Sequence, residues 1–116
     1  MRRITSGDLR QLPADAVADI HTVKQILRAH GATRIVFYGS FSRGDYRHDS
    51  DIDICFEGIP DDRYFHAVAE CLLRTRRTVT PIALENARGT LRSRILQEGK
   101  VIYERRKASR RSRVRS

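Results

Sequence analysis

IVFYGSFSRGDYRHDSDIDICF, residues 35–56, holds two apolar runs separated by a polar loop. The runs at 35–38 and 52–56 are rich in β-forming residues, and each predicts a strand. Gly39 ends the first strand, and because it has no Cβ its backbone can turn sharply and approach a ligand closely. Ser40 is a favoured helix N-cap, so the amides after it predict an anion site at the start of a short helix.

Two aspartates, Asp51 and Asp53, accompany the second strand. The period-2 geometry of a strand sends both carboxylates to one face, where they repel each other. A divalent cation removes that repulsion, and Mg²⁺ commonly uses one or two carboxylates together with substrate phosphates. The aspartates and the Gly39-Ser40 turn therefore predict a site for a nucleoside triphosphate and Mg²⁺. A plain strand, turn and polar strand is the alternative, because neither short motif is specific alone.

The two motifs together resemble the signature of the minimal nucleotidyltransferases of the DNA polymerase β superfamily. Residues 39–44 (GSFSRG) resemble that family's Gly-Ser-aromatic-small-Arg-Gly, and residues 49–54 (DSDIDI) contain its Ser-Asp-hydrophobic-Asp-hydrophobic. The resemblance covers about residues 15–104. In bacteria such small domains are commonly antitoxins paired with a HEPN-type ribonuclease toxin, which they silence by transferring AMP from ATP to one of its tyrosines.

The resemblance implies roles for particular residues. It makes Asp51 and Asp53 the catalytic, Mg²⁺-binding pair, with ATP as the substrate. It makes the nucleotide-binding residues Gly39, Ser40, Arg43 and Ser50. A guanidinium can grip phosphate oxygens at two points, although a solvated loop arginine is the alternative for Arg43.

The sequence departs from the family at a strand expected over residues 79–84. The family usually carries a third aspartate there, facing the other two, and Thr80 stands in its place. Glu85 is the nearest acid by sequence and a possible substitute, although its position is not the family's. A hydroxyl neither holds a metal as a carboxylate does nor accepts a proton as well, so the departure weakens the expected activity.

Three functions from different classes follow. The first is an adenylyltransferase antitoxin in a hetero-oligomer with its HEPN-type toxin. The second is a degenerate domain that neutralises its toxin by binding alone, which Thr80 favours. The third is an RNA-binding module driven by the basic C-terminal residues, in which phosphate contacts would dominate.

The fold class predicted is α/β or α+β, with a small mixed sheet of about four strands and helices mainly on one face. The resemblance implies that this sheet is a polymerase β-like nucleotidyltransferase core. Apolar periodicity predicts helices over 14–30, after Asp61 or Asp62, and over 86–97, with a last strand at 101–103. The expected core-facing stripes are Phe65, Val68, Ala69 and Leu72 in one helix, and Leu91, Ile95 and Leu96 in another.

The 116 residues suit one domain, divided into an N-terminal extension (1–13), a nucleotidyltransferase domain (14–104) and a basic tail (105–116) expected to be disordered. The tail holds seven of the 23 Lys and Arg residues and no acid, so the net charge of +9 belongs mostly to it. This charge makes a weak contact between the tail and nucleic acid possible. No apolar run is long enough to span a membrane and no secretory signal is apparent, so a cytoplasmic location is expected.

Overall fold

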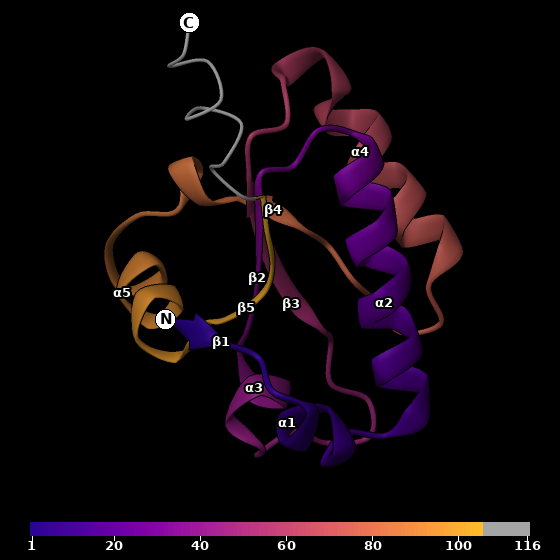
Figure 1. The fold of residues 1–116 in the computed structure, drawn as a ribbon, viewed down its shortest axis with the longest axis vertical. Coiled ribbons are helices and arrows are strands. Elements are labelled where there is room, and N and C mark those ends of the chain that lie inside the picture. The colour runs from indigo at the N-terminus through magenta and orange to yellow at the C-terminus, as the bar shows by residue number, and fades with distance from the viewer. Residues whose placement is uncertain (106–116) are drawn as a thin grey trace, which may run out of the picture.

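A five-stranded mixed sheet runs through the computed structural model, which describes residues 1–105 (Figure 1). The strand order is β1-β5-β2-β3-β4. The strands are β1 Arg2–Arg3, β2 Arg34–Tyr38, β3 Asp53–Glu57, β4 Ile82–Ala83 and β5 Lys100–Glu104. β2 pairs with β3 and with β5 in antiparallel fashion, whereas β4 lies parallel to β3. The predicted mixed sheet is therefore confirmed, with one strand more than expected.

Helices cover both faces of this sheet unequally. The long helices α2 (Ala14–Ala29) and α4 (Asp61–Arg74) pack on one face, and the shorter α5 (Gly89–Glu98) lies on the other (Figure 1). Strand alternation divides the core accordingly, because Phe37 joins the cluster under α2 and α4 while Cys55 joins the one under α5. The prediction of helices mainly on one face is confirmed.

One apolar stripe of α2 explains both its formation and its burial. The buried members recur at helical spacing: Ala16, Ile20, Val23 and Leu27. Asp19 is also buried, 3 % exposed, and its carboxylate accepts hydrogen bonds from the backbone amides of Arg76 and Arg77 at 3.0 and 2.8 Å. α2 thereby holds the segment that leads from α4 to β4.

The outer face of α4 differs from the prediction. Phe65 is 79 % exposed and Leu72 46 %, whereas Ala67 and Cys71 are fully buried. Tyr64 turns toward the sheet, with its ring centroid 5.7 Å from that of Phe56. The expected core stripe was therefore wrong for Phe65, Ala69 and Leu72. The neighbouring stripe has the same helical spacing, and its small residues let α4 pack closer to the sheet.

α5 shows the same effect on a smaller scale. Only Ile95 of the three expected core residues is fully buried, and Leu91 and Leu96 are 38 % and 42 % exposed. The helix begins at Gly89, after the 3₁₀ turn η1 (Leu84–Asn86), and not at Asn86 as predicted. One helix on one side of a narrow sheet has room to bury a single apolar row.

The N-terminal segment is structured, although its sequence lacks clear periodicity. β1 pairs with β5 in parallel, with Arg2 beside Lys100, and α1 (Ser6–Arg10) follows. Thr5 and Asp8 form a capping box at the start of α1, and Asp8 also pairs with Arg2 at 2.8 Å. The hydrogen bond from Arg2 holds the pKa of Asp8 well below its usual range.

The basic tail and the absence of a membrane-spanning helix are the remaining expectations from the sequence. Residues 106–116, most of the predicted basic tail, lie outside the described residues. Among residues 1–105, no helix combines the length and apolar character that crossing a bilayer requires.

Candidate active site

The two sequence motifs meet where β2 ends and β3 begins. Tyr38 pairs with Asp53 in the antiparallel register, and α3 (Ser40–Arg43) starts directly after Gly39. Gly39 has φ +84° and ψ −161°, a conformation that is essentially restricted to glycine. A Cβ at this position would overlap Oδ2 of Asp53 and lie 2.8 Å from its Cγ. The turn is thus packed directly against one of the two carboxylates.

The carboxylate pair is electrostatically strained. Asp53 is half-buried and Asp51 exposed. Burial raises the pKa of Asp53 above its ordinary value, and the negative charge of Asp51 raises it further. The positive charges of Arg94 and Arg43 act in the opposite direction. Ionised at neutral pH, such a pair leaves a negative charge that a divalent cation can neutralise.

The pair fits Mg²⁺ in a two-carboxylate form. Within residues 1–105, no group of three or more His, Cys, Asp and Glu side chains could hold a metal ion. Mg²⁺ is commonly bound by one or two carboxylates, with substrate phosphates and water completing its octahedral shell. Asp51 and Asp53 can therefore supply the protein's share of the ligands, and a triphosphate would have to supply more.

The position of Thr80 follows from the sheet register. Ile52 bridges Val79 and Cys55 pairs with Ile82, both in parallel, so the same offset sets Thr80 beside Asp53. Partners in a parallel pair point to the same side of a sheet. The exposed Thr80 side chain thus stands on the carboxylate side, where the family usually has its third aspartate.

Glu85 does not reach this place. It lies in η1, beyond the far end of β4, and lines a pocket of about 240 Å³ together with Tyr64 and Phe65. Four residues lie between it and Thr80, along a strand that leads away from Asp53. The structure therefore separates the possible substitute acid from the carboxylate pair.

Arg43 stands at the end of α3 and is held by two acids. Its Nη1 donates to Oε1 of Glu98 at 2.9 Å, and its Nε donates to Oδ2 of Asp45 at 3.2 Å. The same Glu98 oxygen accepts the backbone N–H of Gly39 at 3.0 Å. The Gly-Ser turn and Arg43 are thereby tied to a single carboxylate.

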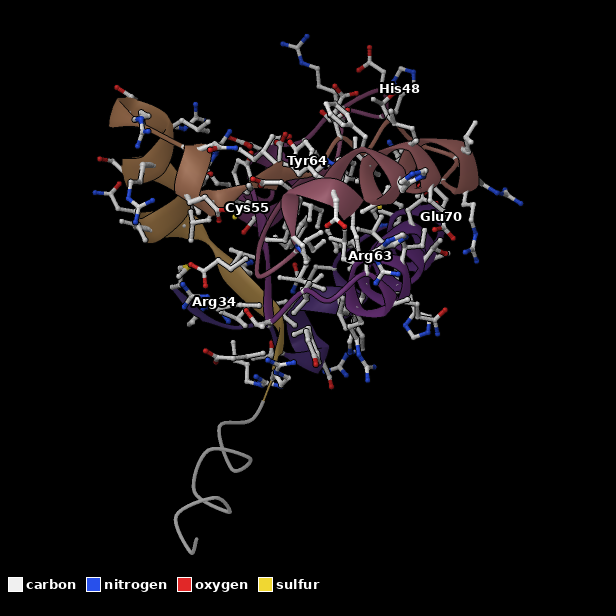
Figure 2. All side chains as sticks on the ribbon, turned by 90° about the horizontal axis from the view of Figure 1, so that it is seen from above. Arg34, His48, Cys55, Arg63, Tyr64 and Glu70 are labelled. Atoms are coloured by element: carbon white, nitrogen blue, oxygen red, sulfur yellow. The ribbon has the colours of Figure 1, made fainter. Side chains whose placement is uncertain are left out.

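Ser50 stabilises the loop between the motifs. Its hydroxyl accepts the backbone N–H of Arg47 at 2.7 Å, which closes a turn just before Asp51. His48 is exposed and projects from the rim of the molecule (Figure 2). Arg77 reaches this loop from the other side and donates to the carbonyl of His48 at 2.6 Å. The loop thus has fixed ends although most of its side chains face solvent.

Three residues near the carboxylates escaped the sequence argument. Glu98 has no signal beyond its place at the end of a helix. Arg94 is exposed on α5, and its positive charge lowers the pKa of both Asp53 and Tyr38. Tyr38 is buried, and this burial, with the charge of Asp53, raises its pKa to about 12. Strand alternation could have predicted the burial of Tyr38, because Tyr38 lies on the same face of β2 as the buried Val36.

Comparisons with known proteins agree with this geometry. The family model described as "Polymerase beta, Nucleotidyltransferase" matches residues 21–108. The protein named "Putative protein adenylyltransferase MJ0604" of Methanocaldococcus jannaschii is 31 % identical over 77 residues, which cover 60 % of this chain and 77 % of the relative.

Solved structures show the same fold at lower identity. A chain in the crystal structure of a toxin–antitoxin with AMP-PNP matches with a TM-score of 0.63 and 19 % identity, over 82 % of this chain and 81 % of the other. A chain in the complex of tri-AMPylated HEPN toxin with MNT antitoxin from Shewanella oneidensis matches with a TM-score of 0.58 and 16 % identity, over 80 % and 76 %. The fold is therefore that of the MNT antitoxins, and the chain belongs to the polymerase beta nucleotidyltransferase family.

Proposed function

We propose that this protein is an antitoxin that transfers AMP from ATP to a tyrosine of a partner HEPN-type ribonuclease toxin, and thereby neutralises it. The observation that carries the proposal is the packing of the Gly39 turn against Asp53, which brings a phosphate-binding motif and a carboxylate pair together. The partner class comes from structural relatives that were crystallised with HEPN toxins, and the reaction class from the name of the archaeal relative. The proposed assembly is a hetero-oligomer.

The residues divide the work by position. Asp51 and Asp53 would hold Mg²⁺, which neutralises charge on the triphosphate and the reacting phosphorus. The turn at Gly39-Ser40 would hold the outer phosphates, with Arg43 assisting and Ser50 keeping the loop in place. Catalysis then consists of positioning and electrostatic stabilisation, without a covalent intermediate on the enzyme.

The acceptor completes the reaction. The hydroxyl oxygen of the partner's tyrosine forms a bond to the α-phosphorus, and the bond from that phosphorus to pyrophosphate breaks. The tyrosine proton leaves to solvent, because Thr80 offers no carboxylate to take it. We therefore expect transfer to be slow.

The absence of a carboxylate at Thr80 also supports a second function. A domain without the third acid could keep ATP binding and neutralise the toxin by contact alone. The two functions differ in whether the toxin carries AMP after incubation with ATP and Mg²⁺.

The test is transfer of labelled AMP from ATP to the purified HEPN-type partner. Wild type should label the toxin, and the double variant Asp51→Asn with Asp53→Asn should not, while both remain folded. The matched control converts another adjacent acid pair, Asp61 and Asp62 at the start of α4, to asparagine and should label normally. If the double variant still labels the toxin with AMP, the proposed enzymatic function is refuted. If wild type inhibits the toxin without labelling it, neutralisation by binding is established.

A further inference from the structure

Glu98 is the last residue of α5, and its carboxylate points to the start and end of α3 at once. Oε1 accepts the Gly39 backbone N–H at 3.0 Å and the Arg43 Nη1 at 2.9 Å. Its backbone carbonyl also accepts the Ser42 hydroxyl at 3.0 Å. Two residues later, the Lys100 ammonium donates to the Ser42 carbonyl at 2.7 Å. The end of α5 and the start of β5 therefore hold α3 through its first turn, through Ser42 and through Arg43.

We propose that Glu98 is a positioning residue that holds Arg43 in register with the Gly39-Ser40 turn, ready for the triphosphate. The proposal rests on the proposed function, because it assigns Glu98 a part in nucleotide binding at that same site. Glu98 does not touch the nucleotide; it acts through the guanidinium.

Oε1 of Glu98 links the Gly39 turn to Arg43, because both donate a hydrogen bond to it. Because the Gly39 amide is part of a buried turn, the oxygen that it binds has a fixed place relative to the turn. Arg43 bonds to that same oxygen, so its guanidinium is set at a defined distance from the turn. Asp45 holds Nε, and within residues 1–105 Nη2 has no hydrogen-bond partner. Two of the three guanidinium nitrogens are thus anchored, and the Nη2 group is left to donate to an anion.

Glu98 is the more effective of the two anchors. Its side chain is 19 % exposed, whereas that of Asp45 is 62 % exposed. Ion pairs shielded from water are screened less than exposed ones, and an arginine loses much rotamer freedom when it is fixed. Fixing it before the ligand arrives removes that cost from binding, an effect of roughly 3- to 10-fold in Kd per rotamer-rich side chain.

On charge alone Glu98 would weaken nucleotide binding, since a carboxylate near a triphosphate repels it. Two neutral variants of similar length separate the effects. Glu98→Gln keeps an oxygen that can accept both hydrogen bonds, whereas Glu98→Met has none. Repulsion alone makes both variants bind the nucleotide more tightly and equally, whereas positioning makes the methionine variant bind more weakly than the glutamine variant.

The experiment measures binding of a non-hydrolysable ATP analogue with Mg²⁺ to the full chain by calorimetry. We expect Kd to be about 3- to 10-fold higher for Glu98→Met than for Glu98→Gln. In an Arg43→Ala background the difference should vanish, because the guanidinium through which Glu98 acts is gone. The control is Glu57→Met against Glu57→Gln, since Glu57 also pairs with an arginine, Arg34, at 3.1 Å, but at the other end of β3. These two variants should bind alike.

Equal Kd values for Glu98→Met and Glu98→Gln overturn the proposal, and so does a difference that persists without Arg43. If Glu98→Met does not fold, Glu98→Asp replaces it: the charge stays, the reach shortens by one methylene, and binding equal to wild type overturns positioning. The outcome stays separate from that of the proposed function. Failure of wild type to bind the analogue refutes the nucleotide site itself, whereas failure of the Glu98 comparison in a protein that binds it refutes only the role of Glu98.

Discussion

Gly39→Ala adds a single methyl group at the point where we expect this site to tolerate it least. The new Cβ would overlap Oδ2 of Asp53 and lie 2.8 Å from Cγ and 3.0 Å from Cβ of the same residue. The backbone cannot relieve the contact easily, because φ +84° with ψ −161° is already disfavoured for any residue with a Cβ. Either the turn or the Asp53 side chain must therefore move.

Two contributions determine how far Gly39→Ala lowers the free energy of unfolding. A non-glycine residue in this backbone region costs about 1–3 kcal/mol. Displacement of a half-buried carboxylate adds about 1 kcal/mol, in the range of packing strain in a well-filled site. The sum is roughly 2–4 kcal/mol, which lowers Tm by about 10–20 °C in a domain of this size. Nucleotide binding should be lost at temperatures where the variant is still folded, because Asp53 is the group that moves.

Gly44→Ala is the matched control at the other end of α3. Gly44 also has a positive φ, +91°, yet a Cβ there meets nothing within 4 Å. Its cost is backbone strain alone, roughly 1–2 kcal/mol. The measurements are the Tm and the binding of the ATP analogue, compared between the two variants. A double variant, Gly39→Ala with Asp53→Ala, removes the carboxylate that the new methyl group would overlap. The reasoning is refuted if Gly39→Ala melts and binds like Gly44→Ala, or if removing the Asp53 side chain restores no stability to Gly39→Ala.

Three further predictions use other parts of the molecule. Thr80→Asp should accelerate AMP transfer to the partner, by up to about 10²-fold if the new carboxylate accepts the tyrosine proton; Thr90→Asp on exposed α5 is the control, and equal rates of Thr80→Asp and wild type would contradict the register argument. Asp19→Leu should destabilise the fold by about 2–3 kcal/mol in denaturant melts, because two backbone amides lose their buried acceptor, and an unchanged midpoint would contradict this. Removal of residues 106–116 should leave Tm nearly unchanged and abolish any salt-sensitive nucleic-acid binding, whereas salt-insensitive RNA binding by the shortened chain would favour an RNA-binding function.

The centre of the fold could be predicted because local and long-range signals coincide there. The two apolar runs, the glycine between them and the alternating aspartates each restrict the same few residues, and only an adjacent strand pair satisfies them all. The register then sets Thr80 beside Asp53 without any further assumption. The resemblance to the family had indicated Thr80 as the place of the missing acid, and the strand register agrees with it.

The peripheral features could not be predicted, for physical reasons. α4 has two stripes of apolar spacing, and the choice between them depends on how closely the helix can approach Phe56 and α2, which no local pattern encodes. β1 consists of two arginines, whose side chains give no strand signal; its formation depends on the open edge of β5. Glu98 is separated from Gly39 by 59 residues, so their hydrogen bond exists only once the sheet has formed.

The two edges of the sheet bear on how this protein behaves at high concentration. Each edge strand is only two residues long: β1 is Arg2–Arg3, and β4 is Ile82–Ala83, preceded by Pro81, which has no backbone N–H to offer. Short strands, positive charge and proline are features that prevent sheets from joining edge to edge into aggregates. Growth into fibrils by strand addition is therefore disfavoured at both edges of the sheet. We expect a larger assembly of residues 1–105 to form through side-chain surfaces, which can be disrupted one residue at a time.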